Sequence, residues 1–160
     1  MSAILECAAP RSPEVEAFAT DLACALAASP KRLSPKYFYD EAGSRLFEEI
    51  TRLAAYYPTR AEMEILATHG QDMAAHLPQG AALVEFGSGS SAKIRLLLDA
   101  IETLSAYVPV DISAGFLAQQ AKALAADHPG LLILPVAADF THPFALPAAV
   151  RERPRAGFFP

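Results

Sequence analysis

The chain has 160 residues, of which 52% are apolar and 19% charged, and 18 acidic residues outnumber 13 Lys and Arg to give a net charge of −5. A chain of this length can bury one ordinary hydrophobic core, which argues against disorder. The acidic balance argues against nucleic acid and anionic membrane as partners, because affinity for either comes mostly from Lys and Arg. No apolar stretch reaches the roughly 18 residues that span a bilayer. Cys7 and Cys24 lack the spacing of a disulfide scaffold or a metal site, so we expect a soluble protein in the reducing cytoplasm.

Residues 1–78 are predicted to form helices and loops only. Ser12 can cap a first helix, and Asp40 can cap a second. Thr59 and Glu62 have the spacing of a capping box at the start of a third helix. The sequence therefore places a helical region before the rest of the chain.

Residues 79–160 alternate between short apolar runs and helical patterns. Strands are expected at 81–86, 107–111, 131–136 and 155–159, and helices between them at 94–104 and 113–128. This alternation is typical of a parallel α/β sheet with right-handed crossovers. A doubly wound sheet normally has about five or six strands, and this part of the chain provides fewer.

A glycine-rich run, Glu85-Phe86-Gly87-Ser88-Gly89-Ser90-Ser91-Ala92-Lys93, joins the first predicted strand to the next helix. Glycine is needed where the backbone turns sharply and where a ligand approaches it closely. The helix that follows offers free N–H groups and the positive end of its dipole. Gly87, Gly89 and Ala92 match the dinucleotide-binding pattern G-x-G-x-x-G/A. Such turns also occur without a ligand, so the pattern alone leaves both interpretations open.

Acidic residues follow the next two predicted strands. Asp111 can accept hydrogen bonds from two ribose hydroxyls, and Asp139 can meet an adenine amino group with Phe140 beside the ring. These positions lie at the carboxyl ends of strands, the edge at which open α/β sheets bind ligands. A nicotinamide dinucleotide and S-adenosylmethionine both fit this arrangement. Glu85 favours S-adenosylmethionine, because its carboxylate can meet a cationic amino acid tail and would repel a pyrophosphate.

Several stretches, taken in order, resemble one family. They are Ser34-Pro35-Lys36-Tyr37-Phe38-Tyr39-Asp40-Glu41-Ala42-Gly43-Ser44-Arg45-Leu46-Phe47-Glu48-Glu49-Ile50-Thr51, then Tyr56-Tyr57-Pro58-Thr59-Arg60-Ala61-Glu62, the glycine turn with Lys93, Tyr107-Val108-Pro109-Val110-Asp111-Ile112-Ser113 and Ala138-Asp139-Phe140. They closely resemble the histidine N-alpha-methyltransferase family, whose enzymes trimethylate the alpha-amino group of L-histidine to hercynine in ergothioneine biosynthesis. The resemblance implies an α/β, Rossmann-like class I methyltransferase core, with residues 1–78 as a helical cap on the substrate side.

The resemblance also implies roles for single residues. The expected contacts of S-adenosylmethionine are Gly87, Lys93, Asp111, Asp139 and Phe140, with Glu85 and Gly89 beside them. Tyr57 is similar to the family's histidine-binding tyrosine, and Tyr39 to an aromatic residue near the methyl donor. Tyrosines in a proline-bounded loop also occur as packing residues. Methyl transfer to an amine is an in-line displacement at a sulfonium, so neither a nucleophilic side chain nor a metal is expected.

The family's pattern continues beyond Phe158-Phe159-Pro160 with a glycine-rich loop, further strands and an inserted domain. We therefore interpret the sequence as C-terminally truncated, and expect the intact protein to be a monomeric enzyme and the 160-residue piece to be inactive. Two alternatives stay open. One is a relative that methylates another amino acid or amine, and the other is a nicotinamide-binding domain or a non-catalytic interaction module.

Overall fold

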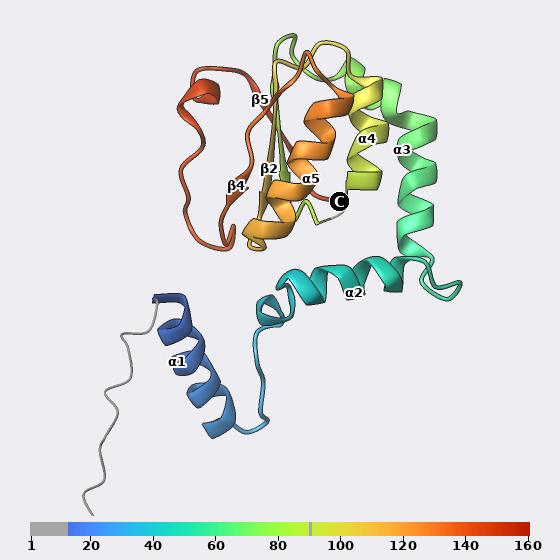
Figure 1. The fold of residues 1–160 in the computed structure, drawn as a ribbon. Coiled ribbons are helices and arrows are strands. Elements are labelled where there is room, and N and C mark those ends of the chain that lie inside the picture. The colour runs from blue at the N-terminus through green and yellow to red at the C-terminus, as the bar shows by residue number, and fades with distance from the viewer. Residues whose placement is uncertain (1–12, 90) are drawn as a thin grey trace, which may run out of the picture. The chain divides into compact units, whose positions relative to one another are not determined.

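The computed structural model of the chain describes residues 13–89 and 91–160. Contacts within the chain divide it into two compact units with the boundary between Phe38 and Tyr39. The sequence suggested a boundary after residue 78 instead. Two helices that precede the first strand therefore fold in the same unit as the sheet (Figure 1).

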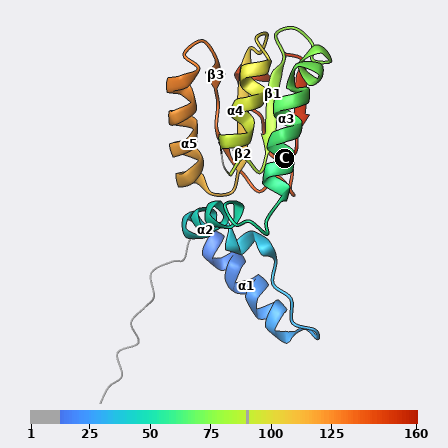
Figure 2. The ribbon, with the colours of Figure 1, turned by 90° about the vertical axis from the view of Figure 1, so that its right-hand side faces the viewer.

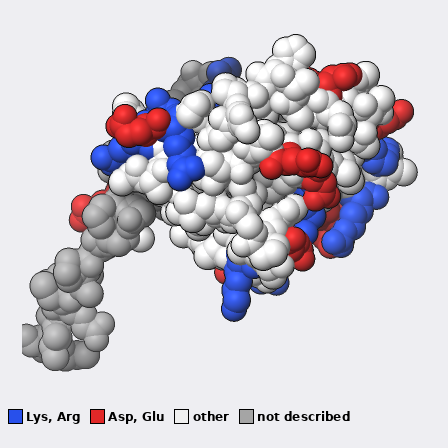
Figure 3. Space-filling view, turned by 90° about the horizontal axis from the view of Figure 1, so that it is seen from above, with Lys and Arg blue, Asp and Glu red and all other residues white. Residues whose placement is uncertain are grey.

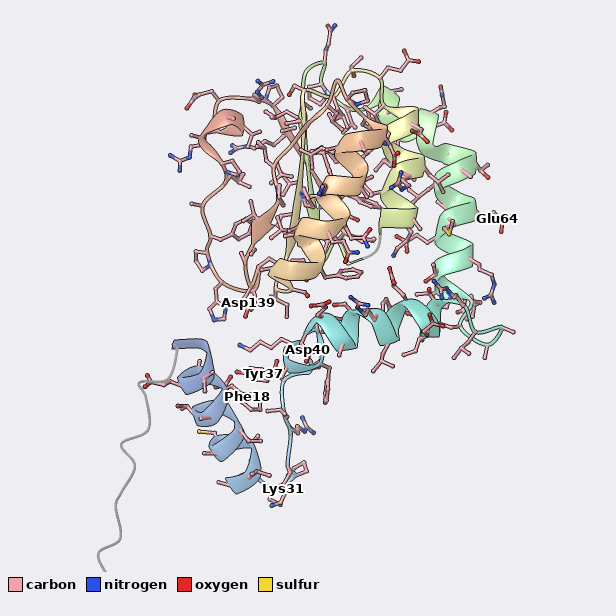
Figure 4. The ribbon with its side chains drawn as sticks, in the orientation of Figure 1. Phe18, Lys31, Tyr37, Asp40, Glu64 and Asp139 are labelled. Atoms are coloured by element: carbon pink, nitrogen blue, oxygen red, sulfur yellow. The ribbon has the colours of Figure 1, made fainter. Side chains whose placement is uncertain are left out.

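The first unit contains helix α1 (Pro13–Ala27), as predicted, and the 3₁₀ turn η1 (Pro35–Phe38). The ring of Tyr37 in η1 packs edge-on against Phe18 of α1, with 4.8 Å between ring centroids (Figure 4). The Tyr37 hydroxyl also donates a hydrogen bond to Asp21 of α1. These contacts connect the turn to the helix.

The second unit is built on a parallel sheet. Its strands are β1 (Ala82–Phe86), β2 (Ala106–Asp111), β3 (Leu132–Ile133), β4 (Val136–Ala137) and β5 (Arg155–Phe158). Their order is β3-β2-β1-β5, β4 also pairs with β2, and every pair is parallel. This order matches one half of a doubly wound Rossmann sheet, so the predicted α/β class is confirmed.

The strand predicted at 131–136 is divided into β3 and β4. Between them, Leu134 donates its N–H to the carbonyl of Tyr107 at 2.9 Å. Pro135 follows and has no N–H to donate. The ladder with β2 is therefore interrupted and resumes at Val136.

Three helices cover one face of the sheet: α3 (Pro58–Ala75), α4 (Ser91–Ala100) and α5 (Ala114–Asp127) (Figures 1 and 2). Their apolar side chains form a buried core against Leu83 and Tyr107 of the sheet. The buried helix and loop residues of this core are Leu66, Ile94, Leu97, Leu98, Ile101 and Leu124. Each Leu or Ile buried in this way stabilises the fold by roughly 1.5–3 kcal/mol.

The opposite face is covered by the segment between β4 and β5, which contains the 3₁₀ turn η2 (Ala148–Val150) (Figure 1). Because side chains alternate along a strand, the other residues of β1 and β2 point to this face. The buried side chains here are Ala82, Val84, Ala106, Val108, Val110 and Val150.

Helix α2 (Glu41–Thr51) begins where the sequence predicted. Asp40 precedes it, and the Asp40 Oδ1 accepts a hydrogen bond from the N–H of Gly43 at 2.7 Å. Ser12, the predicted cap of α1, lies outside the described residues. Ser113 occupies the N-cap position of α5, as predicted, but the expected capping hydrogen bond of its side chain is absent in the described part of the chain.

The predicted capping box of α3 is also wrong. The helix begins at Pro58, so Thr59 already lies inside it. Proline suits the first position of a helix because its φ is fixed near the helical value. The Glu62 carboxylate is engaged elsewhere, in an ion pair with Lys93.

Helix α2 passes across the edge of the sheet at which the strands end (Figures 1 and 2). Its start lies against α5: a Cβ at Gly115 would be 3.9 Å from Oε2 of Glu41. The chain then continues from α2 into α3 on the helical face of the sheet.

Among the described helices, none has the length and apolar character to cross a bilayer. On the face shown in Figure 3, acidic and basic side chains of the described residues are interspersed among uncharged ones.

Candidate functional site

The chemistry-bearing residues that follow β1, β2 and β4 lie together at the carboxyl edge of the sheet. The N–H of Gly87 donates to the carbonyl of Val110 at 2.8 Å, which ties the glycine turn to the end of β2. The N–H of Ala138 donates to the carbonyl of Asp111 at 2.9 Å, which ties the segment containing Asp139 to the same point. Asp139 lies at this edge in Figure 4. The structure therefore brings three separate predicted positions into one place.

The glycine turn leaves room for a ligand close to its backbone. Gly87 has a φ of 79°, a conformation that favours glycine, and a Cβ there would lie 3.8 Å from the ring of Phe140. A Cβ at Gly89 would meet no described residue within 4 Å. Between them, the buried hydroxyl of Ser88 has no hydrogen-bond partner among the described residues. The open space beside the backbone at Gly89 fits a ligand that approaches the turn closely.

The two aspartates at the edge are oriented by the turns that follow them. Oδ1 of Asp111 accepts the N–H of Ser113 at 2.8 Å. Burial raises the pKa of Asp111, although hydrogen bonds from the backbone of Ser113 and Ile112 act to lower it. Oδ1 of Asp139 accepts the N–H of Thr141 at 3.0 Å. In each case a local turn fixes one carboxylate oxygen, so the carboxylate is held at the edge of the sheet.

Phe140 belongs to an aromatic cluster at this edge. Its ring lies edge-on to Phe86, with 5.9 Å between centroids, and edge-on to Phe159, with 5.8 Å. Phe86 and Phe159 stack face to face with 4.6 Å between centroids. Because its neighbours meet Phe140 edge-on, the ring is fixed in position beside the glycine turn, as stacking on a flat ligand requires.

Lys93 lies in the first turn of α4, directly after the glycine turn. Its Nζ is 2.8 Å from Oε2 of Glu62 on α3, and the two side chains are only 19% and 28% exposed. Lysine is unfavourable at a helix N-terminus because the dipole is positive there. The sequence predicts Glu62 in a capping box and not in this pair, for which a lysine at a helix start is the available signal.

Glu85, predicted beside the ligand, lies in the core with 1% of its surface exposed. Its Oε2 accepts a hydrogen bond from the Tyr107 hydroxyl. Burial raises the pKa of Glu85 to about 7, while the Tyr107 hydrogen bond and the charge of Lys93 act to lower it. Burial and the charge of Glu85 in turn raise the pKa of Tyr107, so the phenol keeps its proton and donates. The sequence analysis did not anticipate Tyr107 as the partner of this acid.

The two predicted substrate tyrosines flank α2. Tyr57 immediately precedes α3 and is 69% exposed, and Tyr39 precedes α2 and is also exposed. Phe47 lies between the ends of this stretch, with its ring centroid 6.4 Å from that of Tyr39 and 5.9 Å from that of Tyr56. These aromatic contacts connect α2 to the segments on both sides of it.

Arg60 holds the loop that carries Tyr57. Its guanidinium donates to three carbonyls of the α2–α3 connection: Leu53 at 3.0 Å, Ala54 at 2.6 Å and Tyr56 at 3.1 Å. These carbonyls follow the end of α2, and that of Leu53 also accepts the N–H of Tyr56 at 3.0 Å, so the guanidinium joins a turn of the backbone that is already closed. The sequence analysis did not single out Arg60.

The register between α3 and α4 places Tyr57 at the same edge as the glycine turn. Glu62 pairs with Lys93 near the starts of the two helices, and a Cβ at Gly70 would lie 3.2 Å from Cβ of Ala100 farther along both. The helices therefore run parallel, as Figure 1 shows. Tyr57 precedes the first turn of α3, and so it lies at the end where α4 begins.

Comparison with known proteins identifies the family. A family described as "Histidine-specific methyltransferase, SAM-dependent" matches residues 18–160 of the chain. The chain belongs to this methyltransferase family. The match includes all the predicted site residues, and the recognition made from the sequence is confirmed.

Individual proteins similar to the chain support the same family assignment. Histidine N-alpha-methyltransferase of Mycolicibacterium smegmatis is 47% identical over 129 residues, which are 78% of this chain and 40% of the relative. Ergothioneine biosynthesis protein 1 of Neurospora crassa is 40% identical over 87 residues, 52% of this chain and 10% of the relative. 4-Dimethylallyltryptophan N-methyltransferase of Claviceps purpurea is 34% identical over 100 residues, 61% of this chain and 29% of the relative. The chain spans less than half the length of the relatives it matches.

Proposed function

We propose that the chain binds S-adenosylmethionine at the carboxyl edge of its sheet and forms part of an N-methyltransferase for the alpha-amino group of L-histidine. The observation that carries the proposal is the glycine turn, whose open backbone lies beside Asp111 and Phe140. Membership of the histidine-specific family favours this cofactor over a nicotinamide dinucleotide.

The residues at the edge fit the parts of the cofactor. Asp111 would accept hydrogen bonds from the ribose hydroxyls, and Asp139 with Phe140 would hold the adenine. The turn at Gly87 and Gly89, together with the Lys93 ammonium, would hold the amino acid end, whose carboxylate suits a cation at a helix N-terminus. When bound, S-adenosylmethionine supplies an activated methyl group on a sulfonium. The remaining task of the protein is to position the amine of the substrate and to orient it toward the methyl group.

Tyr57 and Tyr39 would serve the substrate side. The two tyrosines lie on the segments that flank α2, and α2 passes across the edge where the cofactor residues gather. A phenol oxygen can accept a hydrogen from the neutral alpha-amine and so direct its lone pair toward the reacting methyl group. Arg60 maintains the loop that carries Tyr57 by satisfying three of its carbonyls.

The cofactor assignment is tested by calorimetry on the 160-residue chain. We expect S-adenosylmethionine and S-adenosylhomocysteine to bind and to compete with each other. Asp111→Asn should weaken the binding of both ligands, whereas Asp99→Asn, at the far end of α4, should leave it unchanged. Binding of NAD alone, with no heat from S-adenosylmethionine, would overturn the proposal.

The substrate is tested separately, by saturation-transfer NMR with L-histidine in the presence of S-adenosylhomocysteine. We expect a histidine signal that Tyr57→Phe reduces and Tyr56→Phe preserves. Histamine and L-tryptophan serve as comparison ligands, and an equal signal from all three would contradict selectivity for histidine.

A second substrate class is favoured by one relative. The Claviceps purpurea protein is named for methylation of 4-dimethylallyltryptophan, and it matches 61% of the chain at 34% identity. The shared part would then serve the cofactor, and another amino acid would take the place of histidine. Methylation of a prenylated tryptophan in preference to L-histidine, detected by mass spectrometry, would select this alternative.

A further inference from the structure

Lys93 occupies a position that is electrostatically costly unless something compensates it. It lies in the first turn of α4, where the dipole of the helix is positive. The Glu62 carboxylate lies 2.8 Å from its ammonium and comes from a different helix. The charge of Glu62 therefore offsets the dipole and holds the lysine side chain in one direction.

The Glu62 carboxylate is itself carried by a rigid element. One turn beyond it, Leu66 of α3 is buried in the core. Two turns beyond it, Gly70 allows α3 to approach Ala100 of α4 closely. Because both contacts fix α3 against α4, the Glu62 side chain has a defined position relative to the glycine turn.

The other acid near Lys93 cannot take this role. The charge of Lys93 acts to lower the pKa of Glu85, but the Glu85 side chain is buried in the core and one of its oxygens accepts the hydrogen bond of Tyr107. Glu62 is partly exposed and lies on α3, outside the sheet. Among the described residues, only Glu62 forms an ion pair with Lys93.

We propose that Glu62 is a positioning residue of the cofactor site, which holds the Lys93 ammonium beside the glycine turn so that it meets the carboxylate of the cofactor's amino acid end. The inference rests on the proposed function, because it takes S-adenosylmethionine as the ligand. Glu62 does not touch the cofactor in this proposal and acts only through Lys93.

The test is a double-mutant cycle measured by calorimetry on the 160-residue chain, with S-adenosylmethionine and adenosine as ligands. Adenosine lacks the amino acid end. Lys93→Ala should remove a charge-assisted hydrogen bond to the ligand, and Glu62→Ala should release the ammonium that forms it. We therefore expect each substitution to lower the affinity for S-adenosylmethionine about tenfold and to leave the affinity for adenosine unchanged. In the Lys93→Ala background, Glu62→Ala should cause no further loss. Glu64→Ala is the matched control, because Glu64 lies on the outer side of the same helix (Figure 4).

Urea unfolding of each variant shows whether it folds, and Glu62→Gln, which keeps the shape of the side chain, replaces Glu62→Ala if the latter does not. If S-adenosylmethionine fails to bind the unmodified chain, both the proposed function and this inference fall. If it binds and Lys93→Ala weakens it while Glu62 variants do not, only the positioning role is overturned. Weaker adenosine binding in the Glu62 variants, or a further loss in the Lys93→Ala background, would also overturn it.

Discussion

The Tyr107 hydroxyl donates a hydrogen bond to the Glu85 carboxyl group inside the core, directly below the glycine turn. The two residues lie on neighbouring strands and point to the same face of the sheet, where Leu83 of β1 is the register partner of Tyr107. A buried acid needs such a donor, because an unpaired polar group in the interior costs about 1–3 kcal/mol. This pair makes the stability of the core sensitive to pH.

Glu85 should destabilise the folded chain as the pH rises. Its pKa is raised from 4.5 to about 7 in the fold, so the folded state binds the proton more tightly than the unfolded state does. The free energy of unfolding therefore falls between pH 4.5 and about 7 and becomes level above that. This shift in the pKa of Glu85 corresponds to a loss of about 3 kcal/mol in the free energy of unfolding.

Glu85→Gln should remove this dependence, because the amide keeps the shape and accepts the Tyr107 hydrogen bond without ionising. Urea unfolding of the two proteins at pH 5, 6, 7 and 8 measures the difference. We expect the Glu85→Gln variant to gain stability relative to the unmodified chain as the pH rises. Glu102→Gln, at an exposed position, is the control, and a constant difference between the Glu85→Gln variant and the unmodified chain across this range would contradict the prediction.

Tyr107→Phe should destabilise the chain by about 1–3 kcal/mol, because the Glu85 carboxyl group loses its donor inside the core. The loss should grow above pH 7, since the Tyr107 hydrogen bond acts to lower the pKa of Glu85 and its removal makes ionisation harder. Urea unfolding at pH 5 and pH 8 checks this. Tyr57→Phe, at an exposed tyrosine, should leave the unfolding free energy unchanged at both values.

Gly87 and Gly89 should respond differently to alanine. Gly87 has a φ of 79°, so Gly87→Ala should cost about 1–2 kcal/mol of stability. At Gly89 a Cβ would meet nothing described within 4 Å, so Gly89→Ala should change stability by less than about 0.5 kcal/mol.

The same added Cβ at Gly89 would project into the space assigned to the cofactor. Gly89→Ala should therefore weaken S-adenosylmethionine binding in calorimetry while the protein stays folded. Gly130→Ala is the control, since Gly130 also has open space around it and lies outside the glycine turn. Unchanged cofactor affinity in the Gly89→Ala variant would show that the ligand does not approach this part of the turn.

Arg60→Ala should loosen the connection between α2 and α3, because three carbonyls lose the guanidinium that joins them. Faster hydrogen exchange in residues 52–57 and a loss of about 1 kcal/mol in urea unfolding are expected. Arg45, which forms an exposed ion pair with Glu41 at 2.7 Å, provides the comparison. Arg45→Ala should cost less than about 0.5 kcal/mol. Equal effects of the two substitutions would mean that Arg60 does not organise the loop.

The alternation of apolar runs and helical patterns was sufficient to predict the parallel sheet, because each crossover helix must pack on the sheet that its strands form. The division of the apolar run 131–136 into β3 and β4 was not predicted, although Pro135 interrupts the pairing with β2 there. Asp111 and Asp139 were placed at the sheet edge from sequence alone, since strand ends of a parallel sheet coincide.

Contacts between separate elements could not be derived in the same way. Glu62 has capping-box spacing, yet its carboxylate pairs with Lys93, which is distant in sequence. The sequence predicts Glu85 beside the ligand because it adjoins the glycine turn. Its orientation follows from the alternation along β1, which points it toward the helical face with Leu83 and into reach of Tyr107.

The parallel packing of α3 and α4 also restricts where the chain can change length. Glu62 and Gly70 each meet α4, and the helix between them sets both their separation and their relative direction. Deleting one residue between them would rotate one contact by about 100° relative to the other. Insertions and deletions should therefore be tolerated in the connection between α3 and β1, and the spacing from Tyr57 to Gly70 should be constant wherever this arrangement is kept.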